Sequence, residues 1–129
     1  MGYDLSNGKE HFRLSTVSFY KALGLAQTFG WIPKGTVRPQ KMGELEKWDS
    51  EYYTNSGQYV TPEDANNLAV ALEKALENIP DLENPPVYPI KGKIKSRQDF
   101  LNSLGSRETK DRLRKLIAFC REGKGFYIS

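Results

Sequence analysis

The chain has 129 residues, a length that suits one domain with a single hydrophobic core and leaves little room for a second domain. Hydrophobic residues make up 38% and charged residues 27%, and the formal net charge is +3, which is typical of a globular protein and argues against wholesale disorder. No run approaches the roughly 20 apolar residues that span a bilayer, and the N-terminus lacks the apolar core of a signal peptide, so we expect a cytoplasmic protein without membrane contact.

The first predicted elements are a short strand and a helix. Residues 1–5 alternate apolar and polar side chains, which is the pattern of a strand. Ser15 is a favourable N-cap for a helix over residues 16–29, since its hydroxyl can accept from a free backbone N–H of the first turn. Gly30 is a natural C-terminal residue for this helix because glycine adopts positive φ without strain.

A loop and a hairpin are predicted before the centre of the chain. Proline and glycine recur through residues 31–44, which rules out a long regular element, and we expect Trp31 and Ile32 to be anchored against the core. Residues 51–54 and 58–60 have strand-like sequences and flank three residues that include Asn and Gly. We therefore predict that these two segments pair with each other.

The clearest element is a helix over residues 62–78, whose apolar residues recur at three- and four-residue steps. Thr61 can cap its N-terminus, Pro62 suits the first helical position, and Asp64 stands where a capping box places its acid. Pro80 stops the helix. The apolar stripe, which we expect to face the core, consists of Ala65, Leu68, Ala69, Leu72, Ala75, Leu76 and Ile79.

The C-terminal part contains a connector, two helices and a final apolar run. Three further prolines after Pro80 mark residues 80–95 as an extended connector. Ser96 can open a short helix, and a stronger helix covers residues 107–121 after another serine N-cap. Residues 125–129 have a strand-like pattern that could pair with residues 2–5 or with the predicted hairpin.

Cys120 and His11 are the single cysteine and the single histidine of the chain. They provide no internal disulfide and no set of Cys and His ligands for zinc. Cys120 falls on the apolar stripe of the last helix, which favours a buried, unreactive thiol over a nucleophile. No glycine pattern that binds phosphate follows a strand. We therefore expect no metal, no cofactor and no catalytic residue.

The centre of the chain is the densest aromatic region and also carries two amides. Aromatic faces and amide groups can build a ligand pocket or a partner-binding patch, but aromatic residues also fill cores, and we favour the core interpretation. The candidate binding residues are Trp31, Trp48, Tyr52, Tyr53, Asn55, Gln58 and Tyr59.

Charge is unevenly distributed along the chain. Residues 1–90 hold 8 Lys/Arg and 12 Asp/Glu, net −4, whereas residues 91–129 hold 11 and 4, net +7. The basic part could contact a polyanion such as nucleic acid. We favour two simpler interpretations, a solvated face or a basic C-terminal helix that lies against the acidic central helix. The candidate polyanion contacts are Lys91, Lys93, Lys95, Arg97, Arg112 and Arg114.

Three segments resemble those of a family of small bacterial proteins without an assigned activity. They are Gly-Trp-Ile-Pro at 30–33, the stretch from Tyr-Tyr-Thr-Asn at 52 to Ala at 65, and the last segment, 119–129. The resemblance runs through nearly the whole chain and rests on packing, turn and cap residues. It implies a bacterial origin and no particular chemistry.

Together these patterns predict an α+β fold with three main helices and a small antiparallel sheet, in one domain over residues 1–129 with a Pro-rich connector near 80–95. The favoured function is a non-catalytic interaction domain that binds or sequesters a protein partner. The alternatives are nucleic-acid binding through the basic C-terminal part, and a small-ligand site or enzyme at the aromatic cluster. The partner's identity and the oligomeric state are left open.

Overall fold

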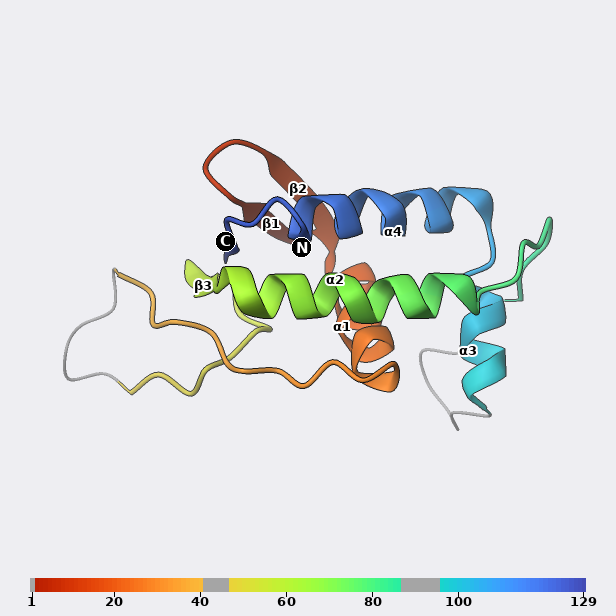
Figure 1. Cartoon of the computed structure of the whole chain (residues 1–129), viewed down its shortest axis with the longest axis horizontal. Helices are drawn as coiled ribbons and strands as arrows, with labels where there is room; N and C mark the ends of the chain where they lie inside the picture. Colours follow the sequence, from red (N-terminus) through yellow and green to blue (C-terminus); the bar gives the residue numbers. More distant parts are fainter. Residues whose placement is uncertain (1, 41–46, 87–95) are drawn as a thin grey trace.

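The structure is a computed structural model that describes residues 2–40, 47–86 and 96–129, and these residues form four helices and a four-stranded antiparallel sheet (Figure 1). In chain order the elements are β1 (Gly2–Ser6), β2 (His11–Ser15), α1 (Thr16–Thr28), β3 (Gln58–Val60), α2 (Pro62–Glu77), α3 (Arg97–Ser103), α4 (Arg107–Cys120) and β4 (Phe126–Ile128). The α+β class is confirmed. The three predicted main helices are present as α1, α2 and α4, and the described residues add a fourth, short helix, α3, behind Ser96.

The strands lie in the order β2-β1-β4-β3, so the first and last strands of the chain are neighbours. Leu5 pairs with Phe12 on one side and with Ile128 on the other, which confirms the predicted pairing of the two terminal segments. The predicted hairpin is wrong. Residues 51–57 contain no strand, and β3 pairs instead with β4, where Tyr59 lies opposite Tyr127. On its other side, Tyr59 forms an isolated bridge with Val37.

Each helix begins behind a serine or threonine. The side-chain oxygens of Ser15, Thr61, Ser96 and Ser106 accept from the backbone N–H three residues later, at the starts of α1, α2, α3 and α4. These bonds satisfy donors that have no partner inside the helix. The predicted starts of all four helices are therefore confirmed by their caps.

The core lies where the helices meet one face of the sheet. In Figure 1, α2 and α4 lie side by side and run in opposite directions, while α1 crosses α2. Leu72 of α2 is fully buried, as the stripe predicts, together with Phe19, Phe126 and Ile128. Arg121 and Glu73 form an ion pair at 2.6 Å that joins the end of α4 to α2. No helix within the described ranges combines the length and the apolar character that crossing a bilayer requires.

A buried lysine ties α4 to the segment that follows α2. Only 6% of Lys110 is exposed, although its charge alone would place it in solvent. Its Nζ donates to the carbonyl of Ile79 at 3.0 Å and to the carboxylate of Asp81 at 2.7 Å. The aliphatic part of the side chain packs in the interior, and the ammonium satisfies a carbonyl that the end of α2 leaves free.

Candidate functional site

Two of the predicted aromatic residues, Trp31 and Tyr52, meet at a buried carboxylate. The indole Nε1 of Trp31 donates to Asp64 Oδ1 at 3.0 Å, and the hydroxyl of Tyr52 donates to Asp64 Oδ2 at 2.5 Å. Asp64 is fully buried, and the two rings are 5.3 Å apart in an edge-to-face arrangement. Burial, followed by the bond to Asp64, raises the pKa of Tyr52 above its usual value of 10.0. These hydrogen bonds connect the loops that carry Trp31 and Tyr52 to the first turn of α2.

The capping-box interpretation of Asp64 is therefore wrong. Its backbone N–H is bound by Thr61 at 3.3 Å, but its carboxylate accepts from the two aromatic side chains. The sequence contained a signal for this, because residues 64, 68 and 72 are spaced four apart and so continue the apolar stripe into the first turn. A carboxylate at such a position needs buried donors, which Trp31 and Tyr52 supply.

Gln58 and Trp48 bind the backbone of the loops around them. Gln58 is fully buried, where its Nε2 donates to the carbonyl of Thr54 at 2.5 Å and its Oε1 accepts from the N–H of Ser56 at 3.0 Å. The indole of Trp48 donates to the carbonyl of Thr36 at 3.1 Å. Their polar groups are thus used within the chain, which favours the core interpretation over a ligand pocket at these residues.

The remaining aromatic candidates lie elsewhere on the surface. Tyr53 is 39% exposed, and its ring meets the ring of Tyr20 edge to face at 4.7 Å. Tyr59 lies on β3 with its ring 4.8 Å from that of Tyr127, and Asn55 is exposed in the preceding loop. The seven predicted residues therefore do not converge on one site.

The described arginines of the basic set are each engaged within the chain. The guanidinium of Arg97 lies 4.2 Å from the ring centre of Phe29, and Arg112 lies 4.7 Å from that of Phe12 and donates to the carbonyl of Arg13. Arg114 donates to Asp111 at 2.6 Å. Neither Arg112 nor Arg114 pairs with an acid of α2; the ion pair to that helix is made by Arg121, the C-cap of α4, with Glu73. Lys91, Lys93 and Lys95 lie outside the described residues.

Cys120 and His11 occupy different environments. Cys120 is 1% exposed in α4, which confirms its predicted burial, and this burial raises the pKa of its thiol to about 12. His11 is exposed on β2. Across residues 2–40, 47–86 and 96–129, no three His, Cys, Asp or Glu side chains gather in a way that could hold a metal ion.

A surface that the sequence did not predict begins where α1 ends. The N–H of Gly30, at φ +100°, donates to the carbonyl of Gln27, and the N–H of Trp31 donates to that of Ala26 at 2.9 Å, which is a Schellman ending. Trp31 then points inward to Asp64, and the next residue, Ile32, is 80% exposed. The prediction that Ile32 is anchored against the core is therefore wrong.

Ile32 borders a groove between this loop and the outer face of α2. The loop after α1 runs along α2 in Figure 1, and the two segments enclose a hollow of about 390 Å³. The α2 residues of the groove recur at helical spacing, at positions 67, 70, 71 and 74. Val70 is 38% exposed there. We call this hollow the 29–34/α2 groove.

The charged side chains around the 29–34/α2 groove are mostly cationic. Lys34 and Lys74 line it, and Arg97 lies over the ring of Phe29, another of its lining residues. Lys34 pairs with Glu63 at 2.5 Å, whereas Lys74 forms no ion pair with any acid of the described chain. The arrangement therefore offers apolar contacts at its centre and positive charge at its rim.

Comparison with protein-family models, with curated proteins and with solved structures finds no match to this chain. The resemblance to a family of small bacterial proteins thus remains a prediction. A functional assignment must depend on the geometry of the molecule itself.

Proposed function

We propose that this chain is a non-catalytic interaction domain that binds an acidic, apolar segment of a partner protein in the 29–34/α2 groove. The observation that carries the proposal is the exposure of Ile32 at 80% beside this groove. Single exposed apolar residues are common on protein surfaces. Ile32 differs because it borders a hollow that Phe29 and Val70 also line.

The backbone holds Ile32 in its exposed position. The Schellman ending of α1 fixes the backbone of Trp31, the residue before Ile32. The buried hydrogen bond from Trp31 to Asp64 fixes the direction of the Trp31 side chain. Pro33 restricts the backbone immediately after it. A preorganised apolar residue loses little conformational freedom on binding, so burial of Ile32 can contribute about 1.5 to 3 kcal/mol to association.

The charges at the rim favour a partner segment that carries acids. Lys74 has no acidic partner in the described chain, and Lys34 can exchange or share its contact with Glu63, since both side chains of that pair are at least half exposed. Acids beside apolar residues in the partner would meet these two cations. Such rim pairs contribute modestly to affinity and more to association rate and specificity.

The size of the groove suits a short amphipathic segment. A hollow of about 390 Å³ is large enough for a few apolar side chains and too small for a whole domain to enter. One face of an amphipathic helix presents such side chains at i, i+3, i+4 and i+7. A helix with leucines on one face and glutamates beside them matches both the apolar centre and the cationic rim.

The non-catalytic part of the proposal is supported by the state of the reactive groups. Cys120, the natural candidate for a nucleophile, is buried, and its raised pKa opposes thiolate formation at neutral pH. The nucleic-acid alternative is weakened because Arg97 already stacks on a ring and Arg114 already pairs with an acid.

The experiment is an NMR titration of the isotope-labelled protein with synthetic peptides of about 14 residues that place leucines at i, i+3, i+4 and i+7. One peptide carries glutamates on its remaining positions, a second carries lysines, and a third keeps the glutamates but has serines in place of the leucines. We expect the first peptide to shift the amide signals of Ile32, Val70 and Lys74. It should bind at least about tenfold more tightly than the second or third.

Ile32→Ser should weaken binding of the first peptide by a comparable factor, because it removes the central apolar contact. The matched control is Val17→Ser, which changes a 45% exposed valine of α1 that does not line the groove. Equal binding of the three peptides, shifts away from the groove, or equal effects of the two substitutions would each overturn the proposal. Binding of a DNA or RNA oligonucleotide near 150 mM salt, in place of the peptides, would favour the nucleic-acid alternative.

A further inference from the structure

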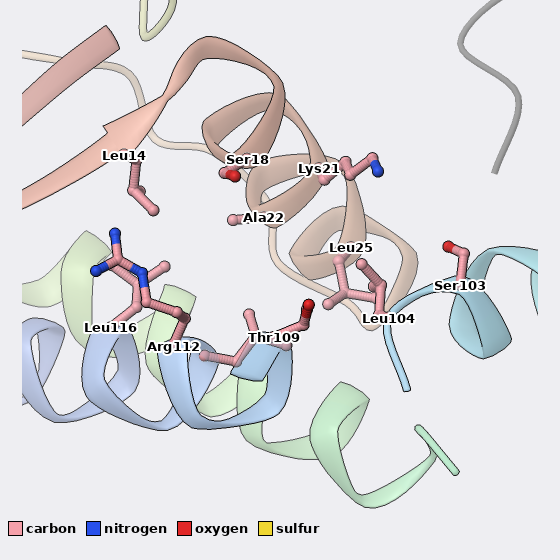
Figure 2. A pocket seen from close by; sticks show the side chains of 11 residues that line it. Leu14, Ser18, Lys21, Ala22, Leu25, Ser103, Leu104, Thr109, Arg112 and Leu116 are labelled. Atoms are coloured by element: carbon pink, nitrogen blue, oxygen red, sulfur yellow. The ribbon is translucent and has the colours of Figure 1, made fainter. Parts of the chain in front are cut away.

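A second hollow lies between α1 and α4, and β2 and the end of α3 also contribute to its walls. It has a volume of about 180 Å³. Its apolar walls are Leu14, Ala22, Leu25, Leu104, Leu113 and Leu116. Figure 2 shows these side chains, apart from the unlabelled Leu113, around one space; they come from β2, α1, α4 and the C-cap of α3. We call it the α1/α4 cavity.

The sequence creates this space by placing short side chains on two facing helices. Positions 18, 21, 22 and 25 of α1 and positions 109, 112, 113 and 116 of α4 each follow the i, i+3, i+4, i+7 spacing of one helix face. Ala22 and Ser18 on one face, and Thr109 on the other, are too small to fill the gap between them. The void therefore lacks the close packing that the interior of a protein normally has.

The polar side chains of the cavity are hydroxyls and two cations. Ser18 and Thr109 each share a hydroxyl–hydroxyl bond with the N-cap serine of their helix, at 2.9 and 2.8 Å, and the hydroxyl of Ser103 donates to the carbonyl of Phe100 at 2.6 Å. The lining includes Lys21 and Arg112 and contains neither Asp nor Glu. The chemistry of the walls thus complements an apolar molecule that ends in an anion.

Arg112 is the group best placed to hold that anion. Its stacking on Phe12 and its bond to the carbonyl of Arg13 orient the guanidinium, and one such bond leaves further N–H donors among the five that a guanidinium carries. In Figure 2 this guanidinium lies beside Leu14 at one end of the cavity, whereas the amine of Lys21 points outward from the rim. A carboxylate at Arg112 would leave its apolar tail directed toward Leu25 and Leu104.

The volume limits the ligand to a small molecule. A cavity of about 150 Å³ lined by apolar side chains accommodates one benzene ring, whereas drug-sized ligands and most cofactors need roughly 300 Å³ or more. The α1/α4 cavity therefore suits one ring or a chain of about six carbons. We propose that it is a binding site for a small organic monocarboxylate, with the carboxylate at Arg112 and the hydrocarbon between α1 and α4.

The test is a titration of the whole protein with sodium hexanoate, hexanol and hexylammonium, followed by calorimetry and by the NMR signals of the leucine methyl groups. We expect hexanoate to bind with a dissociation constant on the order of 1 mM or below. Hexanol and hexylammonium should bind at least about tenfold more weakly, because they lack the charge-assisted bonds to the guanidinium. The shifts should centre on Leu25, Leu104 and Leu116.

Arg112→Gln should weaken the binding of hexanoate by about tenfold or more and leave the binding of hexanol unchanged. Arg114→Gln is the matched control, since Arg114 is on the same helix, pairs with Asp111 and does not line the cavity. The comparison of the three ligands on the unmodified protein needs no variant, so it decides the matter even if Arg112→Gln fails to fold. Equal binding of hexanoate and hexanol would show an apolar void without a carboxylate site. That result, an absence of shifts at the cavity, or an equal effect of the two substitutions would overturn the proposal.

Discussion

Replacement of Asp64 should lower the stability of the fold through the loss of two identified buried hydrogen bonds. Its carboxylate is fully buried and accepts from Trp31 at 3.0 Å and from Tyr52 at 2.5 Å. Asp64→Ala removes the acceptor and leaves an indole N–H and a phenol O–H buried without it. Tyr52 also accepts from the backbone N–H of Gly35 at 2.9 Å, so the loss extends to the loop that carries the 29–34/α2 groove.

The magnitude follows from the two bonds. A hydrogen bond to a charged group contributes about 1.5 to 3 kcal/mol, and a donor left buried without a partner adds its own desolvation cost. Relief from burying the carboxylate offsets part of this loss. We therefore expect Asp64→Ala to lower the free energy of unfolding by about 3 to 5 kcal/mol. Tyr52→Phe, which removes one bond, should lower it by about half as much.

Urea unfolding followed by far-UV circular dichroism measures these differences. The matched control is Glu63→Ala, one residue earlier in the same helical turn, because Glu63 makes an exposed ion pair with Lys34. Its loss should cost no more than about 1 kcal/mol. Equal unfolding midpoints for Asp64→Ala and Glu63→Ala would refute the assignment of Asp64 as a buried acceptor.

Three further predictions concern other buried groups. Lys110→Ala should lower the free energy of unfolding by about 1 to 3 kcal/mol in urea, because it leaves a buried carbonyl without its donor, whereas Asp81→Ala removes an exposed acid and should lower it much less. Similar losses for the two would contradict this. Cys120 should react with a thiol reagent far more slowly in the native protein than in urea, since burial raises the pKa of its thiol to about 12; equal rates would disprove its burial. Burial raises the pKa of Tyr3 to about 12 and also raises that of Tyr52, so their contribution to stability is complete below pH 10. This contribution to the free energy of unfolding should be lost as pH rises through the folded-state pKa values, by at most about 1.4 kcal/mol per pH unit for each tyrosine. A free energy of unfolding that stays level between about pH 9 and pH 12 would contradict the raised pKa values.

The helices were predictable because their signals are local. Ser15, Thr61, Ser96 and Ser106 are good N-caps, and each accepts the expected backbone N–H. The burial of Leu72 likewise follows from spacing alone. Such features depend on residues within one or two turns, so the sequence contains most of the information that determines them.

The strand partners and the surface were not predictable in the same way. Residues 51–60 have the composition of a hairpin, but Gln58 uses its buried amide to bind Thr54 and Ser56, and its strand pairs with β4 at the far end of the chain. Ile32 follows a glycine cap as an apolar residue that could have packed inward. Trp31 already fills that place and is held there by Asp64, which leaves Ile32 outside. These outcomes depend on long-range contacts that no local pattern specifies.

A charge exchange between protein and peptide tests the proposed function most directly. Lys74→Glu reverses the groove cation that has no acidic partner in the described chain, and calorimetry compares it with the unmodified protein, using the glutamate peptide and the lysine peptide. We expect Lys74→Glu to weaken binding of the glutamate peptide by about tenfold and to strengthen binding of the lysine peptide. Affinities for both peptides that do not change, or that fall together, would contradict the 29–34/α2 groove as a site for an acidic partner.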